Sequence, residues 1–451
     1  MKRIYLDNAA TSKVDKSVLK FMIPYFLEDY GNASSLHKIG RIARNAVEES
    51  RKKIADFLGC SASEIIFTSG GTESDVLAIR GLAKNHSNKK KHIITSRIEH
   101  PAVLQTCKSL EDEGFRVDYV PVNSVGVVNI DDIKKLICND TFLVSIMHVN
   151  NEVGSIQPIA EIGELCHSKG IVFHTDAVQS FCKVKIPINS IDLLSVSAHK
   201  INGPKGIGFL YVRKGLKLSP VNTGGGHEFG LRSGTENVPG IVGLSRAVEV
   251  WGGVSKKRIM ESRDYLITEL LKIPGSKLNG PGIASGLRVI SNVNISFSGV
   301  EGDALLIILD NKGICVSTGS ACSSKSSKGS HVLKALGVDT NNSGNLRISL
   351  GIDNTLKECK NVVVAIKEAV EKLRLSTNRG KLLNNSLVID GDYSINEVLK
   401  LIPDSEGVFL KHGIMVSDCI MPLDSSIKVV CKAKNINTKV LLEEINKKIK
   451  K

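Results

Sequence analysis

Several features that would place a chain of this length in a special class are scarce or absent. Aromatic residues make up only 4% of the 451 residues, and none alternate with basic residues as in many nucleic-acid-binding motifs. No apolar run is long enough to span a bilayer, and the basic start MKRIYLDNAATS lacks the apolar stretch of a signal peptide. We therefore expect a soluble, cytoplasmic protein that binds neither membranes nor nucleic acid directly.

Cysteine occurs ten times but never as a C-x-x-C pair. The missing pairs argue against a zinc ribbon, and the scattered spacing argues against a disulfide framework in so long a chain. We expect no metal site, and we expect most thiols to be buried as small apolar side chains, among them Cys315 in NKGICVSTG. At least one thiol could be reactive, and its neighbours must show which one.

Acidic residues are fewer than basic ones, with 46 Asp and Glu against 60 Lys and Arg, which gives a net charge of +14. A lysine-rich, solvated surface is the simplest explanation. The alternative is a basic face for an acidic partner protein or for tRNA. The lack of a basic motif with interleaved aromatic residues gives the tRNA alternative no support.

Short apolar runs alternate with helical stretches from about residue 40 to about residue 250. The segment RIARNAVEESRKKIADFLG has apolar residues at helical spacing and ends at Gly59, a residue type common at helix C-termini. The runs EIIFTS, HIITS, RVDYVPV, TFLVSIMHV, GIVFHTD, LLSVSA and GIGFLYV are each bounded by polar or glycine-rich residues. This alternation predicts an α/β fold with a mostly parallel sheet covered by helices.

The pattern changes after Trp251. We predict first a helix over about 255–273, then the strand NVNISFSGV and the helix DALLIILDNKG. The glycine- and serine-rich STGSACSSKSSKGS comes next, followed by the strand NLRISL and a helix near 355–374. Beyond the linker-like LSTNRGKLLNNS, we predict the strand SLVIDG, the helix INEVLKLI, the strands GVFLKHGIMVS and SIKVVCKAK, and the helix TKVLLEEINKKI. The expected domains are a large one (16–254), a smaller α+β one (1–15 plus 255–375), a linker (376–386) and an appended α+β module (387–451).

Three motifs place candidate site residues where predicted strands end. The join SGGTE at 69–73 would expose backbone N–H groups at a helix start, which suits a phosphate, although a tight turn capped by Thr72 is an equally good interpretation. In HTDAVQ, Asp176 would lie at the edge where α/β proteins bind ligands, or would cap a helix. In SAHKINGPKGIG, Lys200 is a candidate Schiff-base lysine whose pKa desolvation and a neighbouring cation would lower, although a lone lysine is more often a solvated surface residue.

Eight motifs together resemble a known family. YLDNAAT at 5–11, SGGTES at 69–74, EHPAV at 99–103, MHVNNEVG at 147–154, HTDAVQ at 174–179, SAHKINGPKGIG at 197–208, GGGHEFGLRSGTENVPGIVG at 224–243 and STGSAC at 317–322 are similar to cysteine desulfurases of the NifS/IscS type. The match runs from about residue 4 to about residue 375. The resemblance implies a fold-type I pyridoxal-phosphate enzyme with a mostly parallel seven-stranded sheet, which takes sulfur from L-cysteine and leaves L-alanine.

The resemblance also implies roles around the cofactor, pyridoxal 5′-phosphate. Lys200 would hold it covalently, Asp176 would pair with its protonated pyridine nitrogen, and His100 would stack on its ring. The other implied contacts are with the ring oxygen and the substrate (Asn151, Gln179), with the phosphate (Gly71, Thr72, Ser197, His199), and with the phosphate of the other subunit (Thr235). A homodimer is therefore implied.

Two further residues would handle the substrate and its sulfur. Arg347, in NLRISL, resembles the arginine that clamps the substrate carboxylate, although read alone it would be an outward-facing strand residue. Cys322 lies in a glycine- and serine-rich stretch, which predicts an exposed loop whose thiolate attacks the substrate sulfur and passes on a persulfide. Its spacing to VLKALG resembles the long-loop group, so the implied acceptor is an iron–sulfur scaffold or a tRNA-thiolation enzyme.

The chain departs from the family pattern in several places. Phe229 stands where arginine is usual, Val76 replaces an asparagine, and GIDNTLKE replaces a threonine-rich helix start, so Asp353 or Asn354 could be the N-cap. The tail beyond about residue 380 lies outside the pattern. It could dock a partner or brace the dimer.

The two cysteines of this tail raise one more hypothesis. Cys419 and Cys431 could receive sulfur from Cys322, and Cys419 is the better candidate because Cys431 alternates within a predicted strand. Two other functions also stay in view: a selenocysteine lyase or related class V enzyme, and a catalytically weak scaffold or regulatory protein that keeps the fold. Turnover of cysteine and selenocysteine, with and without Cys322, separates the lyase from a desulfurase. A purified protein without the yellow colour of bound pyridoxal phosphate would favour the scaffold.

Overall fold

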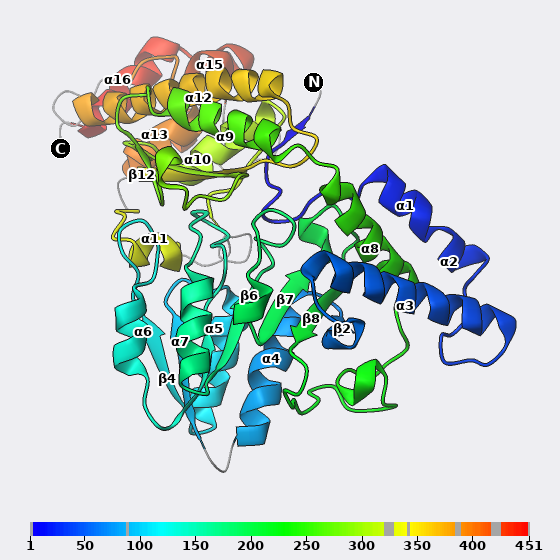
Figure 1. Ribbon diagram of the computed structural model, residues 1–451. Helices are drawn as coiled ribbons and strands as arrows, with labels where there is room; N and C mark the ends of the chain where they lie inside the picture. The colour runs from blue at the N-terminus through cyan, green and yellow to red at the C-terminus, as the bar shows by residue number, and fades with distance from the viewer. Residues whose placement is uncertain are drawn as a thin grey trace. The chain divides into compact units, whose positions relative to one another are not determined.

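The computed structural model describes residues 3–86, 90–319, 329–340, 343–383, 389–415 and 425–449. The chain forms two compact units, Met1–Val370 and Glu371–Lys451 (Figure 1). None of the described helices combines the length and the apolar character needed to cross a bilayer.

A sheet of seven strands, in the order β2-β8-β7-β6-β5-β3-β4, is the centre of the first unit (Figure 1). The strands from β7 to β4 are parallel, whereas β8 runs antiparallel to both of its neighbours. Most of the strand residues are buried, as in a sheet covered on both faces. The predicted mostly parallel sheet is confirmed. Its strands are β2 (Ile65–Thr68), β3 (His92–Ser96), β4 (Arg116–Val120), β5 (Thr141–Ser145), β6 (Val172–Asp176), β7 (Leu193–Ser197) and β8 (Gly208–Val212).

Helices connect these strands, and several contact the sheet directly, among them α4 against β7 and α7 against β6. The helix α3 ends at Gly59 as predicted: its φ is +76°, and its N–H donates to the carbonyl of Ala55. The helices of this part are α1 (Lys16–Met22), α2 (Pro24–Leu27), α3 (Lys38–Leu58), α4 (Gly71–His86), α5 (Pro101–Asp112), α6 (Ile130–Leu136), α7 (Ile159–Ser168) and α8 (Val238–Gly252).

Two smaller sheets follow in the same unit. One is antiparallel, in the order β12-β10-β9, and the other pairs the N-terminal β1 in parallel with β11, Ile4 opposite Ile314. A first strand that pairs with residues more than 300 positions later agrees with an N-terminus that completes this part, but a division of residues 1–375 into two domains stays a prediction. The elements are β1 (Ile4–Tyr5), α9 (Lys256–Leu270), β9 (Ser276–Leu278), β10 (Asn292–Ser298), α10 (Gly302–Asn311), β11 (Ile314–Cys315), α11 (His331–Ala335), β12 (Ser343–Ser349) and α12 (Leu356–Leu383).

The helix α12 corrects two expectations. Its N-cap is Thr355: the N–H of Glu358 donates to Thr355 Oγ1 (3.2 Å), and the N–H of Thr355 donates to Glu358 Oε2 (3.1 Å), a reciprocal capping box. Asn354 does not cap the helix; its side-chain Oδ1 accepts the N–H of Gly351 at 2.7 Å. The helix also continues through residues 376–383, so this part of the predicted linker is helical.

The C-terminal unit is helical in every described element, and the predicted α+β module is wrong. Its helices beyond α12 are α13 (Ile395–Leu401), α14 (Glu406–Lys411), α15 (Ile427–Lys434) and α16 (Thr438–Ile449). The first five residues of the predicted strand GVFLKHGIMVS and most of SIKVVCKAK are therefore helical, whereas the predicted strand SLVIDG lies partly outside the described residues. Phe409, Val430 and Cys431 belong to its buried apolar core. Cys431 is therefore packed, as its sequence indicated, whereas Cys419 lies outside the described residues.

Candidate active site

A cavity of about 250 Å³ opens where several strands of the large sheet end. Its walls come from the loops after β2, β3, β5, β6 and β7, the edge at which α/β proteins bind ligands. Of the predicted site residues, the lining contains Gly71, Thr72, His100, Asn151, Asp176, Gln179, Ser197, His199, Lys200 and Arg347. Thr235 is exposed and outside this lining. Cys322 lies outside the described residues.

Lys200 ends a short 3₁₀ turn that follows β7. Its Nζ donates to the carbonyls of Ala9 and Ala10, each at 2.7 Å. Burial lowers the pKa of this amine to about 8, and the cations Arg347 and Lys183 act in the same direction. Desolvation and neighbouring cations were expected for an amine that acts as a nucleophile. Lys183 is a buried residue that the sequence analysis missed.

Asp176 is the last residue of β6, and it caps a turn instead of the helix considered in the sequence analysis. Its Oδ1 accepts the N–H of Val178 at 2.8 Å and so caps the turn, while the residue also lines the cavity. Burial raises the pKa of the carboxyl group, and a protonated His100, the N–H of Val178 and the Lys200 amine oppose this rise. A cationic group in the cavity would therefore favour the ionised carboxylate.

A second buried carboxyl group lies in the same wall. Asp75 on α4 has an Oδ1 without a hydrogen-bond partner in the described part of the chain, 3.6 Å from Nε2 of His174. Burial and the nearby Asp176 raise the pKa of Asp75 well above its usual value. Nothing in its sequence context distinguished it from an ordinary helix residue, and only the fold places it beside Asp176.

His100 is the N-cap of α5, and this position fixes its ring. Its Nδ1 accepts the N–H of Ala102 at 3.1 Å, which leaves the proton of a neutral imidazole on Nε2. Burial lowers the pKa of His100, and Lys200 and His331 add to the effect although Asp176 opposes it. The residue therefore presents a neutral aromatic ring to the cavity.

The turn between β2 and α4 has no side chain at Gly71, so a ligand can approach its backbone closely. The helix α4 begins at Gly71, so Thr72 lies in its first turn and is not the cap. A Cβ atom at Gly71 would lie 2.7 Å from Cγ2 of Val178. The free backbone N–H groups of this helix start and its dipole favour an anion. Ser197, at the end of β7, adds a hydroxyl to the same cavity.

Arg347 is buried in the middle of β12, with 1% of its surface exposed, so the outward-facing alternative is wrong. One terminal nitrogen, Nη2, lies 2.8 Å from Oδ1 of Asp7, and Nη1 donates to the carbonyl of Asn151 at 3.2 Å. Its Nε is buried without a partner in the described residues. The guanidinium therefore keeps donors free for a further acceptor.

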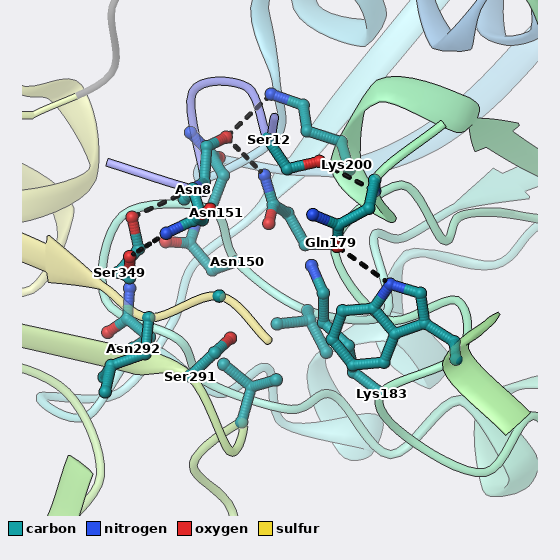
Figure 2. Close-up of a pocket in the computed structure, with 17 residues that line it drawn as sticks. Asn8, Ser12, Asn150, Asn151, Gln179, Lys183, Lys200, Ser291, Asn292 and Ser349 are labelled. Carbon is teal, nitrogen blue, oxygen red and sulfur yellow. Dashed lines mark hydrogen bonds between the residues drawn. The ribbon is translucent and has the colours of Figure 1, made fainter. Parts of the chain in front are cut away.

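The N-terminal segment forms part of the site. The amide of Gln179 donates to the carbonyl of Ala9 at 2.9 Å, the same carbonyl that accepts from Lys200. Figure 2 shows Lys200, Gln179 and Asn151 around this segment, together with an adjoining small cavity that Lys183 also lines. His199 Nδ1 lies 3.1 Å from the hydroxyl of Thr11. The short motif YLDNAAT therefore contributes backbone acceptors as well as side chains.

These groups fit pyridoxal phosphate. The cavity has an anion-binding helix start for a phosphate, a desolvated amine for an aldehyde, a neutral ring to stack on, and the carboxyl of Asp176, whose charged form a pyridinium would stabilise. The orphaned donor of Arg347 adds a position for the carboxylate of an amino acid.

Phe229, which replaces a usual arginine, lies in a strained turn. Both Glu228 and Phe229 have positive φ, +48° and +56°. Arg51 holds this turn: its two terminal nitrogens each lie 2.8 Å from a carboxylate oxygen of Glu228, and its guanidinium lies 5.1 Å from the centre of the Phe229 ring. Arg51 therefore fixes this turn through the Glu228 carboxylate and a cation–π contact with the Phe229 ring.

Comparisons with known proteins agree with this geometry. The aminotransferase class-V family matches residues 4–362. A cysteine desulfurase IscS of Methanosarcina thermophila is 50% identical over 379 residues, 83% of this chain and 93% of its own length. A putative cysteine desulfurase IscS 1 of Bacillus subtilis is 46% identical over 384 residues, 83% of this chain and 100% of its own length.

Solved structures of NifS-like proteins are also similar to this chain. A NifS-like protein superposes with a TM-score of 0.77 at 41% identity, over 82% of this chain and 100% of its own. The structure described as SspA in complex with cysteine superposes with a TM-score of 0.70 at 39% identity, over 78% of this chain and 99% of its own. The similarity thus covers whole relatives but not the whole of this chain.

Proposed function

This chain belongs to the aminotransferase class-V family and is a pyridoxal-phosphate-dependent cysteine desulfurase, and from this premise we propose which residues perform the reaction. Lys200, Asp176, His100 and Arg347 would act on L-cysteine in the cavity, and Cys322 would take the sulfur. The observation that carries this proposal is the convergence of an amine, a carboxyl, an imidazole and a guanidinium on one cavity.

The bound cofactor supplies an electron sink for the bond changes at the substrate Cα. Asp176 would hold the ring nitrogen, His100 would stack on the ring, and Asn151 and Gln179 would contact its oxygen and the substrate. Gly71, Thr72, Ser197 and His199 would hold the phosphate. Lys200, with a pKa near 8, would attach the cofactor and then move a proton at the substrate Cα.

The sulfur step requires a thiolate at Cys322. This thiolate would attack the substrate sulfur and form a new S–S bond, while the bond between that sulfur and the substrate Cβ breaks. The electron pair of the broken bond stays on the carbon skeleton, which takes up protons and leaves as L-alanine. The persulfide on Cys322 then carries the sulfur to an acceptor.

Both flanks of the segment that contains Cys322 are anchored beside the cavity. Ser317 exchanges two backbone hydrogen bonds with Arg347 (3.2 and 2.6 Å). On the other side, the hydroxyl of Ser330 donates to Oε2 of Glu152 at 2.5 Å. Cys322 is five positions after Ser317, and an extended chain over that interval spans at most roughly 17 Å. This reach supports the proposal.

A homodimer is the second part of the proposal. Large apolar side chains are exposed on α1, α2, α3 and the segments between them, and monomers rarely leave so many of them in water. They are Leu19, Phe21, Ile23, Phe26, Leu27, Tyr30, Leu36 and Phe57, exposed by 42–80%. Thr235, exposed in a single chain, would then complete the phosphate site of the other subunit. Light scattering should give about twice 48.7 kDa, and a Phe26→Glu/Leu27→Glu variant should give the monomer mass.

The destination of the sulfur is the third part. The relatives named IscS support delivery to an iron–sulfur scaffold protein, with a tRNA-thiolation enzyme as the other acceptor. We place this transfer in the cytoplasm, where the thiol of Cys322 would stay reduced between turnovers.

The decisive test measures sulfide and alanine released from L-cysteine by the purified holoenzyme. Cys322→Ala should still change the visible absorption of the cofactor when cysteine is added, but it should release no sulfide. Cys315→Ala is the matched control, because this half-buried thiol lies seven residues earlier and should be dispensable. Ordinary sulfide release by the Cys322 variant would overturn the assignment of the nucleophile.

A further inference from the structure

The arginine proposed to clamp the substrate carboxylate already binds a carboxylate of its own chain. Asp7 Oδ1 lies 2.8 Å from Nη2 of Arg347, and the Asp7 side chain is 19% exposed while that of Arg347 is 1% exposed. A buried guanidinium without a counter-ion would be costly, so this contact has a clear electrostatic reason. Whether Arg347 can also bind a substrate carboxylate depends on which of its N–H donors Asp7 leaves free.

A guanidinium has five N–H donors. Asp7 occupies one on Nη2, and the carbonyl of Asn151 occupies one on Nη1. The remaining donors are the buried Nε–H, which has no partner in the described residues, and one N–H on each terminal nitrogen. A substrate carboxylate needs two of them, so Arg347 can bind Asp7 and the substrate at once.

The backbone holds Asp7 in register with the strand that carries Arg347. Ser349 N donates to Leu6 O at 2.7 Å, and Asn8 N donates to Ser349 O at 3.2 Å, so both neighbours of Asp7 are bonded to β12. The hydroxyl of Tyr5 donates to the Asp7 carbonyl at 3.1 Å. Asp7 is therefore a fixed group on a fixed segment.

We propose that Asp7 is a positioning residue: it fixes the guanidinium of Arg347 so that its remaining donors face the α-carboxylate of the substrate. This inference rests on the proposed role of Arg347. Asp7 also acts on the amine of Lys200 in the direction opposite to Arg347, because its negative charge raises the lysine pKa that the arginine lowers. One carboxylate thus orients the clamp and offsets its charge at the neighbouring amine.

The test compares Asp7→Asn, Asp7→Glu, Arg347→Ala and the Asp7→Asn/Arg347→Ala pair as holoenzymes. Asp192→Asn is the matched control, because this buried carboxylate lies 2.8 Å from Arg213 and does not line the cavity. The readouts are KM and kcat for L-cysteine, and the affinity for L-alanine from the change in visible absorption of the bound cofactor.

Asp7→Asn should raise both KM and the dissociation constant of L-alanine by about tenfold, with kcat within about threefold of the wild type. Asp7→Glu should recover most of the affinity, because the charge returns. In the Arg347→Ala background, Asp7→Asn should add nothing. Asp192→Asn should change neither constant.

Unchanged or tighter binding of L-alanine by Asp7→Asn would overturn the inference, and so would an effect that simply adds to that of Arg347→Ala. Unchanged binding by Arg347→Ala alone would instead overturn the clamp on which the inference rests, so the two failures are distinguishable. If Asp7→Asn does not yield holoenzyme, Asp7→Ser, which is smaller, carries the same expectation.

Discussion

The wall of the cofactor cavity and the core of the C-terminal unit are both buried, but they bury opposite kinds of side chain. The cavity and its surroundings enclose Asp75, Asp176, Lys183 and Arg347, groups that lose free energy when they leave water. The C-terminal core around Phe409 is built mostly of apolar side chains. The buried charged groups of the cavity are held in position by the large sheet around them, whereas the apolar core stabilises the C-terminal unit itself. Substitutions should therefore affect chemistry in one region and folding in the other.

The largest expected effect tests the first half of this comparison. Lys200→Ala should lose covalent attachment of the cofactor and reduce turnover by about 10³-fold or more, because no other described amine in the cavity wall takes its position. Mass spectrometry after borohydride reduction, together with the sulfide assay, measures both. Lys214→Ala, an exposed lysine, should behave as wild type. Covalent cofactor in the Lys200 variant would contradict the assignment.

The second prediction concerns the apolar region. Phe409→Ala should destabilise the C-terminal unit by about 3–5 kcal/mol, because the cavity left in so small a core cannot be refilled. The chain has one tryptophan, Trp251 in α8, so its fluorescence follows the first unit while circular dichroism follows both. The midpoint of the unfolding transition followed by Trp251 fluorescence should not change. Leu410→Ala, exposed by 51%, is the control, and a loss of bound cofactor in the Phe409 variant would refute the separation.

The third prediction returns to the cavity and concerns pH. An amine attaches the cofactor only when unprotonated, so attachment should fall as the pH drops below the Lys200 pKa of about 8. Lys183 lowers that pKa, so Lys183→Met should raise it and move the midpoint to higher pH by at most about one unit. The initial rate of attachment to apoenzyme, measured against pH, shows the shift. Lys185→Met, two residues away and exposed, should leave the midpoint unchanged.

The smallest expected effect lies in the C-terminal unit. Ser394 and Glu397 form a capping box at the start of α13, with bonds of 3.2 Å and 2.8 Å. Ser394→Ala should lower the stability of this unit by about 1 kcal/mol, and Ser394→Thr should restore most of it. Denaturant unfolding followed by circular dichroism measures the change. An effect on the fluorescence transition of Trp251 would show that the two regions are not separate.

The sequence predicted the first unit well because glycine turns and polar strand ends mark its elements. Alternating runs predicted the large sheet, and Asp176 and Lys200 were placed correctly at strand ends. The same approach missed Asp7, Asp75 and Lys183, because a lone charged residue carries no sign of burial. These three become part of the site only when the fold brings their segments together.

The C-terminal unit shows where local patterns mislead. IKVVCKAK is rich in β-branched residues and was interpreted as a strand, yet its buried residues Ile427, Val430 and Cys431 follow helical spacing. Ser426 precedes this helix and Asn435 ends it in the left-handed region (φ +56°), so start and stop signals were present. The strand prediction was wrong because it gave the β-branched composition of this eight-residue segment more weight than the helix start and stop signals.

The pairing of the N-terminus with distant strands has a consequence for biosynthesis. Leu6 and Asn8 bond to Ser349, and Ala9 and Ala10 close the wall around Lys200. A ribosome adding 5–20 residues per second needs roughly 20–70 s to reach position 349 after position 8. The first residues made thus wait for β12, the last described strand of the unit, and the nascent chain cannot complete its cofactor cavity until then.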